Sequence, residues 1–197
     1  MKRRGLVDAG AVALGAGAAA TVGLGGGPAM GQAGHRVIPD VEVWTHDGQK
    51  ARFYSDLVRD RVVTLNFFFT GCAETCPLVT QNLRVVQDLL GDRVGRDVFM
   101  YSVTLQPELD TVEVLREHVE QWEVGPGWTF LTGSPSEIER LRRATGFASG
   151  DPELDVILDN HIGMLRYGND RLDRWAGCPA LGRPEWIAKR IGSLASI

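Results

Sequence analysis

The sequence predicts one three-layer α/β domain with a β-hairpin near each end. The chain has 197 residues and is 44% hydrophobic, which suits one domain with a normal core and a short appendage. The run Val62–Phe69 is mostly β-branched and aromatic, as expected of a fully buried strand. Strand and helix patterns alternate after it, and such alternation is typical of α/β domains.

Residues 1–33 differ from the rest of the chain. The basic residues 2–4 precede a weakly apolar stretch (5–27), and residues 31–33 resemble a signal-peptidase site. The paired arginines also resemble a twin-arginine export signal. The alternative is an uncleaved membrane anchor, but the stretch is rich in Gly and poor in Leu, Ile and Phe, so it would partition weakly into hydrocarbon. We therefore favour an export signal that is removed.

This reading places the folded domain at residues 41–197, after a linker at 34–40, in the periplasm or another extracytoplasmic compartment. Contact with a membrane is expected only through residues 1–33, if they are retained. Without them the net charge changes from −4 to −6, because they carry three basic residues and one acidic residue. The acidic balance would suit a basic partner, and the lack of a long Lys/Arg run argues against nucleic-acid binding.

The first half of the domain is expected to form a hairpin, a strand and a helix. Val41–Trp44 and Ala51–Tyr54 flank an Asp-Gly turn, as in a β-hairpin. The buried strand Val62–Phe69 follows. The helix is expected to start at Pro77 and to stop at Gly91, because apolar residues recur between them at helical spacing: Val79, Leu83, Val86 and Leu90.

The second half continues the alternation. Strands are expected at residues 98–104 and 128–131, with a helix between them. Ser134 and Glu137 form a capping box for a third helix, which Gly146 ends.

The end of the chain is expected to form a second hairpin and a last helix. The hairpin strands are expected at residues 161–167 and 172–175, with the turn at 168–170. Pro184 begins the helix, whose apolar residues are Ile187, Ile191 and Leu194.

Cys72 and Cys76 carry the clearest chemical signal. They directly follow the buried strand and precede the helix, and α/β sheets bind ligands where their parallel strands end. A helix start offers free N–H groups and partial positive charge, which favour thiolates. Residues four apart lie about one helical turn apart, so both sulfurs can face the same way. The pair suits a soft metal ion, and its spacing also permits a disulfide.

Three interpretations of this pair are open: a metal site, a catalytic thiol pair and a structural disulfide. A disulfide across so short a loop would constrain the unfolded chain little. Redox pairs of the thioredoxin type have two residues between the cysteines, whereas here there are three. We favour the metal site.

Among the four histidines, His161 is the candidate third ligand. His35 lies in the linker, His46 in a turn and His118 on the second helix. His161 is expected to open a late strand, on the element that returns beside the first helix in this type of fold. Two thiolates and an imidazole suit copper, and three ligands suit Cu(I) better than zinc, which takes four in structural sites.

Cys178 is the odd cysteine of the chain. An unpaired thiol in an exported protein can bind a partner or take part in redox chemistry. It can equally be a small buried apolar residue. The second interpretation is slightly favoured, although no neighbouring motif supports either.

These residues resemble the Sco/SenC family of copper-binding assembly factors for cytochrome c oxidase. Thr70–Pro77 is similar to the family's T-x-C-x-x-x-C-P motif, residues 102–111 to its S-V-D-P-x-x-D-T segment, and residues 128–133 to its tryptophan-to-glycine strand. His161 falls where the family's copper-ligating histidine is expected. The similarity extends over most of residues 41–175.

The resemblance implies a thioredoxin-like fold and a copper ion held by Cys72, Cys76 and His161. It also makes Asp110 a candidate for a residue that supports the metal ligands without binding the ion itself. The alternative is that Asp110 is the N-cap of the second helix. The chain departs from the family pattern at Leu105-Gln106, which replaces the usual Asp before a proline. These features indicate a divergent member.

Two functions follow from the resemblance. As a metallochaperone, the chain would pass copper by ligand exchange to a recipient such as an oxidase subunit. As an exported thiol-disulfide oxidoreductase, it would use Cys72 and Cys76 to reduce client cysteines and would need a thiol reductant. We favour the chaperone. His161 separates the two, because thiol exchange needs no distant imidazole. A peroxidase on the same fold has no clear signal in the sequence.

Overall fold

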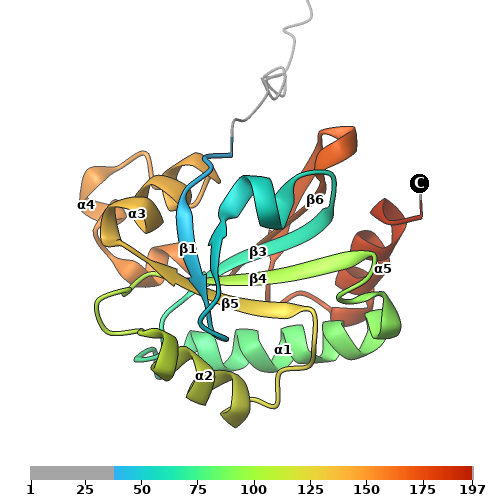
Figure 1. Cartoon of the computed structure of the whole chain (residues 1–197), viewed down its shortest axis with the longest axis horizontal. Helices are drawn as coiled ribbons and strands as arrows, with labels where there is room; N and C mark the ends of the chain where they lie inside the picture. The colour runs from blue at the N-terminus through green and yellow to red at the C-terminus, as the bar shows by residue number, and fades with distance from the viewer. Residues whose placement is uncertain (1–37, 197) are drawn as a thin grey trace, which may run out of the picture. The chain divides into compact units, whose positions relative to one another are not determined.

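The computed structural model describes residues 38–196, which are built around one seven-stranded sheet (Figure 1). The strand order is β2-β1-β5-β4-β3-β6-β7. The predicted export signal at 1–33 lies outside the described residues, as does most of the predicted linker at 34–40. Of that linker, Pro39 is buried, and the Asp40 carboxylate accepts hydrogen bonds from the backbone N–H (2.9 Å) and hydroxyl (2.7 Å) of Ser55.

The sheet is mixed. Its centre is parallel, with β4 between β3 and β5. The flanking pairs are antiparallel: β1 with β2 and β5, and β6 with β3 and β7. Parallel neighbours need a long crossover, and α1 and α2 supply the two crossovers. The strands are β1 Glu42–Thr45, β2 Lys50–Arg52, β3 Val62–Phe68, β4 Val98–Thr104, β5 Trp128–Gly133, β6 Met164–Asn169 and β7 Arg174–Pro179.

The helices begin at recognisable signals. Thr111 caps α2 and Ser134 caps α3, each accepting a hydrogen bond from a backbone N–H in the first turn, and Pro184 opens α5. The α-helices are α1 Thr75–Leu90, α2 Val112–Gln121, α3 Pro135–Ala144, α4 Pro152–Asp155 and α5 Pro184–Leu194. The other helical turns are the π-turn η1 Phe53–Val58 and the 3-10 turns η2 Gly91–Arg93, η3 Leu158–His161 and η4 Asp170–Leu172.

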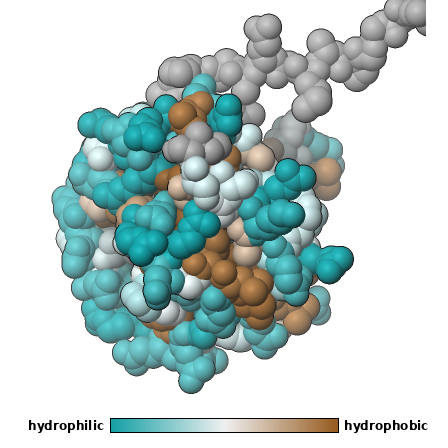
Figure 2. Space-filling model, turned by 90° about the vertical axis from the view of Figure 1, so that its right-hand side faces the viewer, coloured by the Kyte–Doolittle hydropathy of each residue, from teal (hydrophilic) through white to brown (hydrophobic). Residues whose placement is uncertain are grey.

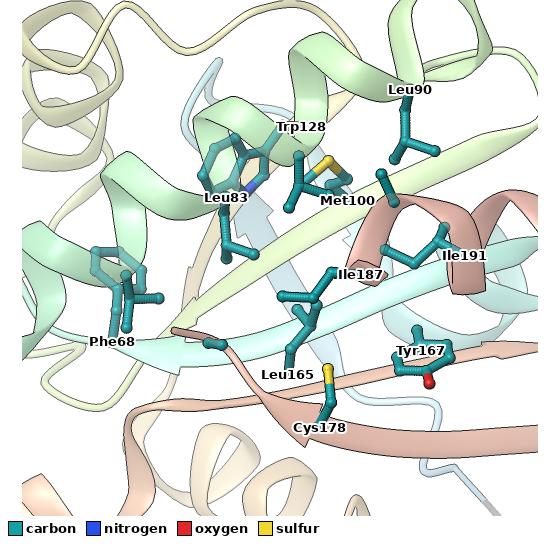
Figure 3. Close-up of a cluster of buried hydrophobic side chains, with 14 of the residues drawn as sticks. Phe68, Leu83, Leu90, Met100, Trp128, Leu165, Tyr167, Cys178, Ile187 and Ile191 are labelled. Atoms are coloured by element: carbon teal, nitrogen blue, oxygen red, sulfur yellow. The ribbon is translucent and has the colours of Figure 1, made fainter. Parts of the chain in front are cut away.

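Two hydrophobic cores lie on the two faces of the sheet. Helices α1, α2 and α5 cover one face, where Leu83 and Ile187 are fully buried (Figures 1 and 3). The turn η1 and helix α3 cover the other face, with Phe53 and Leu141 at its centre. Strand β3 contributes to both cores, because its side chains alternate between the faces and all seven are buried. The domain is therefore three layers deep.

A buried chain of hydrogen bonds joins the three parallel strands. The Trp128 indole N–H donates to the Ser102 hydroxyl (2.9 Å), which donates to the Asn66 side-chain oxygen (2.7 Å). Buried polar groups are costly unless they are paired, so these two hydrogen bonds favour the observed alignment of the strands over a slipped alignment.

The predicted three-layer α/β architecture is confirmed, with both hairpins and the predicted order of strands and long helices. In the second hairpin the predicted turn at 168–170 and strand at 172–175 are displaced: the turn is η4, and β7 runs over Arg174–Pro179. The start of the first helix is wrong by two residues. It begins at Thr75, so Cys76 already lies in its first turn, ahead of Pro77. The predicted strand at 51–54 is also shorter. The chain leaves the sheet after Arg52 and forms η1, because Phe53 turns into the core.

The prediction that His161 opens a strand is wrong, because His161 ends the 3-10 turn η3. Strand β6 begins three residues later, at Met164. The separation arises at Gly163, whose φ of +85° lies in the region that favours glycine and is incompatible with a continuous strand.

No helix within residues 38–196 is long and apolar enough to span a membrane. The side of the domain that faces right in Figure 1 is largely hydrophilic, with one strip of hydrophobic residues (Figure 2). Helix α1 is two-sided: Leu83 points into the core, whereas Leu78, Val85 and Leu89 are about half exposed.

Leu83→Ala is expected to lower the free energy of unfolding by about 2–5 kcal/mol, because it leaves a cavity between α1 and the sheet. Leu83 is 0% exposed. The matched control is Leu89→Ala on the same helix, where the side chain is 51% exposed and the cost is expected to be within about 1 kcal/mol. Urea unfolding of the full chain measures both, and equal losses would contradict this packing.

Candidate metal centre

The two cysteines lie at the junction of β3 and α1. After β3 ends, the Cys72 backbone N–H donates to the Phe69 carbonyl (3.2 Å) and closes a tight turn. The Cys76 backbone N–H then donates to the Cys72 sulfur (3.2 Å). Cys72 is 9% exposed and Cys76 4%, and both are free thiols. The junction thus brings two reduced sulfurs together at the surface of the core.

The Cys72 sulfur replaces a cap side chain at the start of α1. The first N–H groups of a helix have no partner within the helix. Glu74, at the N-cap position, makes no side-chain cap bond. The N–H of Cys76 is instead satisfied by the sulfur four residues earlier. The cysteine spacing therefore serves the local fold as well as any ligand.

Burial raises the pKa of the Cys76 thiol to about 12. A hydrogen bond with the Cys72 side chain and the negative charge of Asp159 contribute to this rise, while the Phe69 backbone acts in the opposite direction. Cys76 is therefore a neutral thiol at neutral pH. A soft cation that binds this sulfur must displace the proton.

Asp110 supports the turn from below. Its carboxylate is fully buried and accepts hydrogen bonds from the Thr70 backbone N–H (3.2 Å), the Thr70 hydroxyl and the Thr104 hydroxyl. Thr70 follows β3 directly before the cysteine turn, and Thr104 ends β4. The alternative prediction, that Asp110 is the N-cap of the second helix, is wrong, because the cap of α2 is Thr111.

His161 lies near the cysteine turn, but its ring is engaged elsewhere. The neighbouring Asp159 acts electrostatically on Cys76, and a Cβ on Gly163 would lie 3.9 Å from the Thr75 methyl group. The imidazole of His161 is 3% exposed, and its Nε2 lies 2.7 Å from the Asp155 backbone oxygen. A carbonyl oxygen only accepts, so Nε2 carries the proton.

Arg142 covers the His161 ring. All five of its N–H groups are used by other acceptors: two carboxylates, those of Glu139 (2.7 and 2.8 Å) and Asp155 (2.8 and 2.9 Å), and the Phe147 carbonyl (2.9 Å). Its Nη1 is nevertheless 3.1 Å from Nδ1 and 3.0 Å from Nε2 of His161. An atom so placed lies over the ring, and the guanidinium therefore packs against the imidazole face.

The electrostatics of this cluster follow from the ion pair. Hydrogen bonds from Arg142 hold the pKa of the Asp155 carboxyl well below its usual range, and the Ser149 backbone N–H (2.7 Å) acts in the same direction. The paired carboxylates raise the pKa of Arg142 in turn. Burial opposes both shifts, but the hydrogen bonds and opposite charges outweigh it, so the pair is charged at neutral pH.

The structure brings Cys72 and Cys76 together and directs His161 to another cluster. No group of three or more His, Cys, Asp or Glu side chains within residues 38–196 is placed to hold a metal ion. The chemistry of the sulfur pair fits a soft ion such as copper, because both donors are buried sulfurs. The imidazole would have to turn to join them.

The remaining histidines that the structure describes have other roles. His46 Nδ1 accepts a hydrogen bond from the Phe130 backbone N–H (3.1 Å). His118 packs against the rings of Phe68 and Phe130, with both centroid distances 5.3 Å, and burial lowers its pKa.

Cys178 is a buried core residue. It is 4% exposed, and its sulfur points into the cluster under α5 (Figure 3). Burial raises its pKa, so the thiol is neutral at neutral pH. This placement agrees with the interpretation of Cys178 as a small apolar residue.

Sequence reasoning missed Arg142 and Asp155, although one signal for Arg142 was present. Ile138, Leu141 and Thr145 mark the core side of α3 at spacings of three and four residues, and position 142 falls on the same side. An arginine there must find buried acceptors. No signal pointed to Asp155, because its partner lies 13 residues away on another element.

Comparison with known proteins identifies the family. The SCO1/SenC family model matches residues 31–154, which is more than half of the chain. The chain belongs to the SCO1/SenC family. The Arabidopsis thaliana "Protein SCO1 homolog 1, mitochondrial" is 31% identical over 103 residues. That stretch is 51% of this chain and 30% of the Arabidopsis protein, so the chain spans less than a third of that relative's length.

Solved Sco structures share the fold. Copper-bound ScoI of Bradyrhizobium japonicum superimposes with a TM-score of 0.61 at 17% identity, covering 78% of this chain and 96% of that chain. BsSco, described as a member of the Sco family of cytochrome c oxidase assembly proteins with a disulfide switch, gives a TM-score of 0.62 at 23% identity, with 81% and 94% coverage. These likenesses confirm the predicted thioredoxin-like fold.

The raised pKa of Cys76 predicts slow alkylation at neutral pH. Only the thiolate reacts, so the rate is expected to rise about tenfold per pH unit through pH 10, without the plateau that an ordinary thiol reaches near its own pKa of about 8.5. Iodoacetamide labelling of the reduced full chain, resolved by peptide mass spectrometry, measures this rate. The same chain in guanidinium is the control, and a plateau below pH 9 in the folded chain would contradict the assignment.

Asp110→Asn is expected to destabilise the chain by about 1–3 kcal/mol, because the side-chain NH2 group of Asn cannot accept hydrogen bonds and the buried Asp110 carboxylate accepts three. Asp92→Asn, at an exposed position on η2, is the matched control and should change stability by less than about 0.5 kcal/mol. Urea unfolding of both variants decides, and equal stabilities would show that the buried carboxylate does not support the turn.

Proposed function

We propose that this chain is a copper-binding metallochaperone that assists the assembly of a copper centre in a respiratory oxidase. The observation that carries the proposal is the pair of buried, reduced sulfurs of Cys72 and Cys76 at the end of β3, in a member of the SCO1/SenC family. Thiolates favour soft ions over Mg²⁺, Ca²⁺ or Mn²⁺.

Each residue has a distinct role in this function. Cys72 and Cys76 hold the copper cargo as thiolates, and the proton on Cys76 leaves when copper binds. His161 supplies the third ligand after its ring turns toward the sulfurs. Asp110 fixes the turn that carries the cysteines by tying Thr70 to Thr104, so that the sulfurs keep their spacing when the ion is lost.

The setting of the function is extracytoplasmic, and the recipient is a copper-accepting protein such as an oxidase subunit. The predicted export signal at 1–33 supports the location. Two descriptions of other proteins support the recipient: ScoI was solved with copper bound, and the Sco family is described as cytochrome c oxidase assembly proteins. Ligand exchange with a recipient that offers similar ligands would release the ion.

A second candidate function uses the same sulfurs. As an oxidoreductase, one cysteine thiolate would attack a client disulfide and form a mixed disulfide. The other would then attack that bond, releasing the reduced client and leaving a Cys72–Cys76 disulfide that a thiol reductant must reduce again. The contact between Cys72 and Cys76 favours this chemistry, and the disulfide switch described for BsSco is a parallel.

Copper titration of the full chain, reduced and anaerobic, tests the proposal. About one tightly held Cu(I) per chain is expected in competition with a chromogenic Cu(I) chelator. Cys72→Ser and Cys76→Ser are expected to abolish tight binding, and His161→Ala to weaken it by about tenfold or more, as loss of one ligand implies.

Cys178→Ala is the matched control, because Cys178 is a cysteine buried in the core beneath α5. It should leave the copper stoichiometry unchanged. Absence of specific copper binding, together with rapid cycling of a Cys72–Cys76 disulfide that His161→Ala leaves intact, would overturn the chaperone and establish the oxidoreductase.

A further inference from the structure

We propose that Arg142 and Asp155 are positioning residues of the copper site: they hold the His161 ring away from the cysteine pair, and copper gains its third ligand only when the ring leaves them. The inference rests on the proposed function, in which His161 is a ligand. It concerns residues of α3 and α4, outside the cysteine turn.

The first step is that the ring is held by two separate contacts. The guanidinium of Arg142 packs on its face, with Nη1 3.0 and 3.1 Å from the two ring nitrogens. In the ring plane, Nε2–H donates to the Asp155 carbonyl (2.7 Å). Copper binding through Nε2 requires loss of that proton and of that hydrogen bond, and movement of the ring by any route ends the packing on Arg142.

The second step is that Arg142 itself is fixed. Its five N–H groups are all satisfied by Glu139, Asp155 and Phe147, and its side chain is buried. A planar guanidinium paired bidentately with two carboxylates has little rotational freedom. The ring therefore packs against a rigid charged surface, rather than against a mobile side chain.

The third step is that the residues on either side of His161 lie near the start of α1, which carries Cys76. Asp159, two residues earlier, acts electrostatically on Cys76, and Gly163, two residues later, faces the Thr75 methyl group. The segment thus approaches the cysteine turn on both sides of His161, while the ring is directed to Arg142 and Asp155. A change in ring direction with a local backbone adjustment would bring the third ligand to the sulfurs.

The fourth step is that His161 lies at the edge of the domain, next to hollows of the surface. His161 lines two hollows of the surface. One, of about 540 Å³, is shared with Asn160 and Met164. The other, of about 380 Å³, is shared with Arg142, Asp155 and Val156. The His161 side chain is 2% exposed, so the ring lies behind the surface of these hollows and its release has to displace the side chains that cover it.

The consequence is a lower copper affinity than the three ligands could give. If the binding-competent ring direction is a minor state, the apparent dissociation constant rises by the inverse of its population. The two sulfurs can hold Cu(I) without the ring, since soft thiolates suit that ion. Arg142 and Asp155 would therefore set how much the imidazole adds to affinity, and so how readily the ion passes to a recipient.

The metal-free test measures access to the ring. Arg142→Lys keeps the charge but loses the planar fork, and Asp155→Asn keeps the shape and weakens the ion pair. In the reduced full chain, diethyl pyrocarbonate is expected to modify His161 about tenfold faster in both variants, as the loss of one charge-assisted hydrogen bond implies. Peptide mass spectrometry reads His46 and His118 in the same samples, and their rates should not change, which distinguishes ring release from unfolding.

The copper test uses competition with the same Cu(I) chelator. Arg142→Lys and Asp155→Asn are expected to bind Cu(I) up to about tenfold more tightly than the unmodified chain. Arg140→Gln is the control, because Arg140 is exposed on the same helix, and it should change neither readout. In a His161→Ala background, Arg142→Lys should have no effect on affinity, because the contact acts through the ring.

The outcomes separate this inference from the proposed function. Unchanged His161 modification and unchanged affinity in the Arg142 and Asp155 variants, with weaker binding by His161→Ala, would overturn the inference and leave the three-ligand site intact. If His161→Ala binds Cu(I) as tightly as the unmodified chain, both the third ligand and the inference fall. Tighter binding that persists in the His161→Ala background would also overturn the inference.

Discussion

The buried carboxylate of Asp110 is the contact on which the cysteine turn depends. It accepts hydrogen bonds from Thr70 and Thr104, and so joins the segment that follows β3 to the end of β4. A buried charge is stable only when its oxygens are satisfied, so the carboxylate and the two threonines fix one another. Since β3 is buried on both faces, the turn that follows it has a firm base. The position of the two sulfurs is a consequence of this base.

The two halves of the proposed copper site differ in how far they are assembled. The two cysteines are joined by a hydrogen bond from the Cys76 backbone N–H to the Cys72 sulfur, so one sulfur caps the helix that carries the other. The imidazole is bound to an ion pair on α3 and α4. A protein that stores a metal gains from a fully preorganised site, whereas a protein that passes its metal on gains from a ligand that is released at low cost. A sulfur pair that is already assembled, with a third ligand held elsewhere, matches the requirement of a protein that passes its metal on.

Contacts in the core account for the positions of the two segments of family resemblance that lie outside the cysteine turn. Trp128 and Ser102, from two different segments of family resemblance, are joined by a buried hydrogen bond that continues to Asn66 on β3. These segments align the parallel strands, rather than contacting the sulfurs. Cys178 likewise belongs to the core beneath α5. The chain thus keeps the framework of its family, although its identity to solved relatives is only 17–23% in the two structures compared.

The sequence by itself determined the fold class, the order of strands and long helices, and the cysteine pair. Periodicity and turn residues report on contacts within a few residues, and the cysteine turn is local. It misplaced the start of α1 and the conformation around His161, where Gly163 adopts a positive φ. Only the tertiary structure decided that Asp110 lies under Thr70, 40 residues away, and that Arg142 and Asp155 hold the His161 ring. These contacts join elements far apart in the chain, and their partners are chosen by packing and by the need to satisfy buried charge.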